Sequence, residues 1–345
     1  MQLAEELNLI PWSRATRRSV TSAGARMLVL ALAAWASISA LLAIWLPLQV
    51  SVITVFLFAG PHNWFELRYF LLRLPVRFGR SRAFFLTAFA GIAFLTLTYI
   101  SLPLIYNFNL WPGADWSIPI AIWNTLMLVW LGVLVWLRGK LKPRSDWLWG
   151  IPVAFLLVAI NWFVPELFSL GIVYAHPLIA LWFFDRHLKR ARPEWLPAYR
   201  RCLCLLPILI VGICWKLAPT SPLADDNGLF WRITQHAGAQ LLPNVSSHLL
   251  VSVHLFLEML HYAVWLVALP LIGARGRFWD VKTVPLARHP RGFPRLVMAM
   301  LILGLFLAGL LWFGFSVDYT TTRDVYFTVA IAHVLAEAPF LMRML

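Results

Sequence analysis

Residues 246–272 form an unbroken apolar stretch, SSHLLVSVHLFLEMLHYAVWLVALPLI, in which Glu258 is the one acidic or basic residue besides histidine. A helix crosses the hydrocarbon core of a bilayer with about 20 apolar residues. The stretch therefore predicts a membrane-spanning helix. It also carries His254 and His261, and ionisable groups in hydrocarbon are costly unless they pair with each other or bind a ligand. The same stretch thus predicts a functional face.

The rest of the chain has the same character. Of its 345 residues, 61% are hydrophobic and 13% are charged. That composition leaves too little polar surface to cover a water-soluble globule of this length. We expect an all-α fold, a polytopic membrane bundle of about ten transmembrane helices. The predicted spans are 27–47, 49–72, 83–105, 118–137, 147–164, 167–185, 202–218, 246–272, 296–315 and 323–342.

Lysine and arginine fall in alternate loops between these spans, which is typical of loops on the cytoplasmic side. The basic clusters lie at 14–26, 73–82, 138–144, 186–201 and 275–295, whereas the other loops hold one arginine, Arg232. This predicts that both termini are cytoplasmic, with 1–26 a cytoplasmic segment and 27–345 a single transmembrane domain. The net charge of +14 then reflects contact with membrane lipids, and we expect no nucleic-acid partner.

Three glutamates lie well inside predicted spans, and each follows a histidine by four residues. Residues four apart share one face of a helix, so each pair directs an imidazole and a carboxylate into the same space. Two further histidines lie inside predicted spans, and one of them is in the stretch 246–272. The pairs are His62 and Glu66, His254 and Glu258, and His333 and Glu337, and the further histidines are His261 and His176.

These side chains predict a metal site at mid-membrane, because the helices that carry them run in the same direction and their imidazoles can meet. Imidazole and carboxylate are the ligands of non-haem iron, manganese or zinc, and we favour iron. Glu258 and His261 also match the Glu-x-x-His unit of di-iron bundles, although a second copy is missing. The predicted metal ligands are His62, His176, His254, His261 and His333, and the predicted catalytic acids and bases are Glu66, Glu258 and Glu337.

The same glutamates have two other interpretations. Each carboxylate could hydrogen-bond a ligating imidazole and fix its tautomer, instead of transferring protons itself. The pairs could also be separate contacts between neighbouring helices, each worth about 1 kcal/mol. A site shared by several helices explains the common depth better than separate contacts do.

The segment Gly60-Pro61-His62 on an early helix, followed by single histidines on later helices, resembles the bacterial Brp/Blh group of membrane carotenoid oxygenases. That resemblance implies one non-haem iron held by four histidines, cleavage of β-carotene to retinal, and a place in the bacterial inner (cytoplasmic) membrane. It implies His62, His176, His254 or His261, and His333 as the iron ligands.

The sequence therefore favours a membrane-embedded non-haem iron oxidoreductase, an oxygenase that acts on a lipophilic substrate such as a carotenoid, a quinone or an acyl lipid. An electron-donor protein is a possible partner. A haem-b-binding electron-transfer protein is one alternative, since two imidazoles on facing helices can ligate haem. A proton or metal-ion transporter is another, and it predicts polar residues that continue from the site to both membrane surfaces.

Overall fold

The computed structural model describes residues 14–113, 115–142, 149–224, 228–273, 281–290 and 292–344. Within these ranges every regular element is a helix and no strand occurs. The longer helices are α2 (Arg14–Trp45), α3 (Pro47–Arg73), α4 (Arg82–Asn107), α5 (Ser117–Leu141), α7 (Pro165–Ala191), α14 (Pro294–Val317) and α15 (Tyr319–Met344). The shorter ones are α6 (Gly150–Phe163), α8 (Leu196–Leu203), α9 (Leu205–Leu217), α10 (Leu229–His236), α11 (Ser247–Ala263), α12 (Leu269–Gly273) and α13 (Pro285–Arg288).

The ten predicted spans all fall on helices where they are described. The segment 202–218 is divided between α8 and α9, and the segment 246–272 runs through α11, a π-helical turn at Val264–Ala268, and α12. Residues 1–13 of the predicted N-terminal segment, and residues 147 and 148 of the fifth span, lie outside the described residues.

Eight helical segments in the described part of the chain are long and apolar enough to cross a bilayer. The other two predicted spans correspond to α3 and α6. Helix α6 has 14 residues, about 21 Å at 1.5 Å per residue, which is shorter than a hydrocarbon core of about 30 Å. Helix α3 is long enough, but the polar residues from His62 to Arg68 lower its hydropathy. The chain is an all-helical integral membrane protein, and the count of ten spans and the side of the termini stay predictions.

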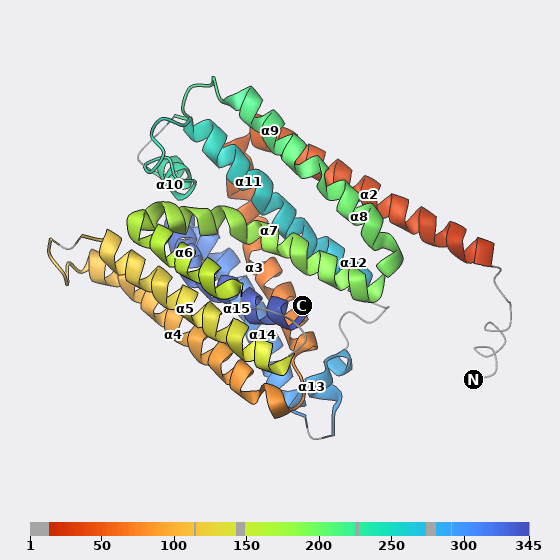
Figure 1. Cartoon of the computed structure of the whole chain (residues 1–345). Helices are drawn as coiled ribbons and strands as arrows, with labels where there is room; N and C mark the ends of the chain where they lie inside the picture. Colours follow the sequence, from red (N-terminus) through yellow and green to blue (C-terminus); the bar gives the residue numbers. More distant parts are fainter. Residues whose placement is uncertain are drawn as a thin grey trace.

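Helix α11 is the central element of the bundle. In the most apolar 18-residue part of the segment Ser247–Ile272, 72% of the sequence is buried inside the protein. The corresponding share in the other candidate spans is at most 39%. Helix α11 packs against α2, α3, α7 and α9, whereas α15 packs against α3, α4, α5, α7 and α14. Figure 1 shows α2, α8 and α9 along one side of the molecule and α4 and α5 along the other, with α3, α7, α11 and α15 between them.

The outward faces of the helices are apolar. Helix α14, for example, exposes Ile302, Leu305, Phe306 and Phe313. Exposed apolar side chains of this kind on successive turns are expected where a helix faces lipid instead of water. Polar side chains gather instead on the inner faces of α3, α7, α11 and α15, and this positions the candidate site.

Candidate metal centre

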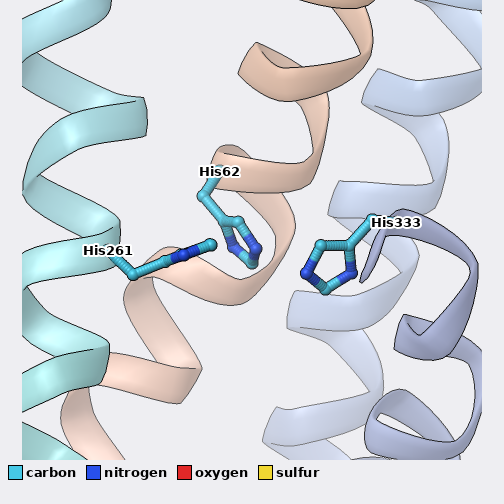
Figure 2. Close-up of side chains that lie close together, drawn as sticks. All are labelled: His62, His261 and His333. Atoms are coloured by element: carbon cyan, nitrogen blue, oxygen red, sulfur yellow. The ribbon is translucent and has the colours of Figure 1, made fainter. Parts of the chain in front are cut away.

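Three histidines from three helices point toward one another at the centre of the bundle (Figure 2). They are His62 on α3, His261 on α11 and His333 on α15, and one ring nitrogen from each lies within 4.8 Å of the others. His62 and His261 are almost completely buried, at 1% and 3% exposure. These distances are those of a group that can hold a single metal ion.

A fourth histidine and a carboxylate extend the cluster. His176 on α7 and Glu337 on α15 form a second group with His261, again with one atom from each within 4.8 Å of the others. The Nε2 atoms of His176 and His333 are 3.2 Å apart. Metal–nitrogen bonds of about 2.0–2.1 Å put two nitrogens of one tetrahedral ion about 3.3 Å apart. The pair already has the spacing of two ligands on a shared ion.

The orientation of His62 is fixed by the backbone of its own helix. Its Nδ1 lies 3.0 Å from the carbonyl oxygen of Phe58. A carbonyl oxygen only accepts hydrogen bonds, so Nδ1 carries the proton and the lone pair of the neutral ring is on Nε2. Metal-ligating histidines are commonly held in this way by a hydrogen bond from the other ring nitrogen. The contact leaves Nε2 free to bind a cation.

Several buried polar atoms in the cluster have no hydrogen-bond partner among the described residues. Native proteins rarely leave such atoms unsatisfied, and a bound ion is one explanation. A cation between the two groups would bind one nitrogen of each ring and a carboxylate oxygen of Glu337, because the two nitrogens of one imidazole point in different directions. The atoms are both ring nitrogens of His261, Nδ1 of His333, and both carboxylate oxygens of Glu66 and of Glu337.

The three predicted carboxylates have different surroundings. Glu337 is fully buried, and its Oε2 lies 3.0 Å from Nδ1 of His176, although the two groups are not aligned as a hydrogen bond. Glu258 accepts a 2.8 Å hydrogen bond from the hydroxyl of Tyr262. The ring of Tyr262 in turn lies 4.8 Å from that of His62, centroid to centroid. Glu337 belongs to the cluster, whereas Glu258 adjoins it through Tyr262.

His254 lines a cavity next to these histidines, but it belongs to neither of the two groups found among the described residues. Its ring is 5.1 Å from that of His236 on α10 and 5.7 Å from that of Tyr174, centroid to centroid. His254 and His261 are seven residues apart and share one face of α11, so the sequence could not decide which of them lies level with His62. The structure brings His62, His176, His261 and His333 together and leaves His254 about two turns away.

Each helix that contributes to the cluster has a local irregularity beside its site residue. Pro61 precedes His62 in α3, Pro177 follows His176 in α7, and Pro339 lies two residues after Glu337 in α15. In α11 the π-helical turn Val264–Ala268 begins three residues after His261. Proline inside a membrane helix removes a backbone hydrogen bond, and π-turns are frequent at functional sites. These prolines are a sequence signal beside the site positions, although Pro103 inside α4 shows that the signal is not specific to the site.

The cluster borders a cavity of about 130 Å³, here called the histidine cavity. At about 30 Å³ per water molecule, this space accommodates roughly four waters. Its wall includes Tyr326 and Tyr99, which reasoning from the sequence missed because aromatic residues are abundant throughout the chain. Tyr326 lies seven residues before His333, two turns along the same face of α15, and that spacing was the available signal.

The chain was compared with protein-family models, with curated proteins and with solved structures, and none of the three comparisons gave a match.

Proposed function

We propose that this integral membrane protein is a non-haem iron oxidoreductase, an oxygenase that acts on a lipophilic substrate in the inner membrane of a bacterium. One observation carries the proposal: four imidazoles and one buried carboxylate from four helices form two overlapping groups of possible metal ligands, which share His261. Side chains of this kind are stable inside a bilayer bundle when a cation holds them together. Imidazole with carboxylate suits iron, manganese or zinc.

The geometry favours a catalytic metal over a structural one. Structural metal sites are closed by protein ligands, whereas catalytic sites keep a position open to water or substrate. The histidine cavity provides such an open side next to His62, His176, His261 and His333. The bound iron would supply the activation of dioxygen. Glu66, Glu258 and Glu337 would take up or release protons beside the substrate.

The class of substrate follows from the position of the site. A site enclosed by membrane helices is reached most directly from the lipid phase, and a carotenoid, a quinone or an acyl lipid can enter from there. The resemblance of Gly60-Pro61-His62 to the Brp/Blh carotenoid oxygenases supports a carotenoid among these.

Haem b fits the site less well than a single iron ion does. The histidine cavity, at about 130 Å³, is smaller than the roughly 300–1,000 Å³ of pockets that hold drug-sized ligands. A haem would therefore require the four helices to move apart. Purified protein should accordingly show no Soret band, whereas a haem protein would be red.

A transporter is disfavoured by the aromatic floor of the site, defined as Tyr69, Phe70, Phe183, Trp265 and Phe340. These side chains belong to one buried cluster. In α3 the cluster residues lie between His62 and the end of the helix at Arg73. Phe70 and Phe340 stack with their ring centroids 4.3 Å apart. A transport path needs polar groups on both sides of the site, and the mostly apolar character of this cluster disfavours one.

Oxygen consumption by the purified, iron-loaded protein tests the proposal. We expect consumption that depends on an added lipophilic compound, with β-carotene, a quinol and an unsaturated fatty acid tried separately. The variant His62→Ala should show none, because it lacks one ligand. A wild-type protein that retains no iron after loading and desalting would contradict the proposal.

A further inference from the structure

Two further cavities lie between the histidine cavity and the outer surface of the bundle, and each shares part of its wall with the next. A lateral cavity of about 540 Å³ lies between α3, α14 and α15, and an inner cavity of about 300 Å³ lies between α3 and α15. The lateral and inner cavities share Asn63, Leu67, Tyr326 and Val329 in their walls. The inner cavity and the histidine cavity share Tyr326, Ala330 and His333.

The lateral cavity opens toward lipid. Its rim includes Leu307, Leu310 and Val325, which are 52%, 51% and 57% exposed. Part of its wall is closely packed around a small residue, because a Cβ atom at Gly304 would lie 3.1 Å from Leu67 Cδ2 and 3.2 Å from Trp64 Cδ1. Its volume lies in the range of pockets that bind small molecules, roughly 300–1,000 Å³. An apolar molecule in the membrane can enter here without crossing water.

The wall of the inner cavity includes ionisable side chains. Glu66 lines it, is 1% exposed, and has no hydrogen-bond partner for either carboxylate oxygen within the described part of the chain. His333 lies in the same wall. A buried carboxyl group without a partner is unfavourable, and a hydrogen-bond donor on a ligand would satisfy it.

We propose that these two cavities bind a long apolar molecule that enters between α14 and α15 and carries a hydrogen-bond donor, such as a hydroxyl group, at its leading end. The donor binds Glu66 and the chain extends outward past Val329. This proposal rests on the proposed function in one respect, since the leading end is the part that reaches the metal ligands. It restricts the substrate to chain-like lipids with a polar end, such as a hydroxylated carotenoid, a quinol or a fatty acid, and it disfavours β-carotene, which has no hydrogen-bond donor.

Photolabelling tests the route. The probe is a long-chain alcohol with a diazirine in the chain, added to the detergent-purified full-length protein. We expect adducts in 304–314 of α14 and 321–329 of α15. Val329→Trp, which places a bulky ring at the junction of the two cavities, should reduce labelling about tenfold, a loss of about 1.4 kcal/mol in binding. The matched control is Val129→Trp, because Val129 is 55% exposed on α5 and lines none of the three cavities.

Adducts spread evenly over the exposed helix faces, or labelling that Val329→Trp leaves unchanged, would overturn the route. Metal analysis of the same samples separates this outcome from a failure of the proposed function. Labelling at α14 and α15 in a protein without metal would contradict the iron site alone. Scattered labelling in a protein with stoichiometric metal would contradict the route alone.

The donor at the leading end is tested with the methyl ether of the same probe. We expect the alcohol to label about tenfold more than the ether, and Glu66→Leu to remove this preference. Glu66→Gln keeps an acceptor oxygen at the same place and should preserve the preference. Equal labelling by alcohol and ether in the wild-type protein would overturn the role of Glu66.

Discussion

At the scale of single residues, the structure separates two histidines that look equivalent in the sequence. Within the described residues, neither ring nitrogen of His261 has a hydrogen-bond partner, and its ring lies beside those of His62 and His333, whereas His254 contacts His236 and Tyr174. His261→Ala should therefore remove the bound metal, and His254→Ala should leave the metal content close to that of the wild type. Elemental analysis of both variants after identical purification makes the comparison. Equal loss in the two variants would show that the ligand set includes His254.

In the proposed site, Glu337 would influence the metal through His176 and by its own charge. Its Oε2 lies 3.0 Å from His176 Nδ1. Replacing a residue that orients a ligating imidazole typically lowers metal affinity about 10–100-fold. We therefore expect Glu337→Gln to lower the metal affinity by about 10–100-fold. Competition with a chelator of known affinity measures it. The control is Glu166→Gln, because Glu166 lies in the first turn of α7, away from the cluster. A metal affinity unchanged in Glu337→Gln would place that carboxyl outside the site.

At the scale of helices, Pro61 contributes to the position of His62. Proline lacks the N–H that would bond to the carbonyl four residues earlier, and this allows α3 to bend next to the site. Pro61→Ala should restore that bond, raise or preserve the thermal stability, and weaken metal binding. Pro103→Ala is the matched control, because Pro103 lies inside α4, a helix that supplies no ligand. Weaker metal binding in both variants would mean that the effect is not specific to the site.

A pair of hydrogen-bonded asparagines holds the short helix α6 in the bundle. Asn124 on α5 donates a 2.8 Å hydrogen bond to Asn161 on α6, and Asn161 donates one of 2.8 Å to the carbonyl of Ala121. Hydrogen bonds between membrane helices contribute about 0.6 kcal/mol on average and up to about 1.7 kcal/mol. Asn161→Leu should therefore lower the free energy of unfolding by about 1–2 kcal/mol without loss of metal.

The measurement is unfolding of the detergent-solubilised protein followed by circular dichroism. Thr98→Val provides the control, since the bonds of the Thr98 hydroxyl in the described part of the chain are to Phe94 and Leu95 of its own helix. Its effect should stay below about 0.5 kcal/mol. Loss of metal in Asn161→Leu would instead show that α6 supports the site.

At the scale of the whole molecule, the hydrophobic pattern was sufficient to predict the helices, because each apolar segment must satisfy its backbone hydrogen bonds internally in lipid. It could not predict the length of α6 or the break at Cys204 between α8 and α9, since both depend on how neighbouring helices pack. The four-residue spacing of histidine and glutamate predicted which faces turn inward. It did not give the depth of each residue, and so it could not rank His254 against His261.

The cavities could not be predicted from the sequence, for a related reason. The wall of the space between α3, α14 and α15 includes close contacts between small residues far apart in the chain, as where Gly60 meets Ala308. No periodicity along a single helix reports such a meeting. The identity of the metal is likewise set by the joint geometry of four helices and not by any one segment.

X-ray absorption at the metal edge of the purified wild-type protein tests the central claim most directly, the claim that these imidazoles hold one iron ion. The account predicts stoichiometric iron with nitrogen and oxygen neighbours at about 2.0–2.2 Å, as for imidazole and carboxylate ligands in general, and with the outer-shell scattering of histidine rings. A protein that carries no stoichiometric metal, or iron held in a porphyrin, would contradict it.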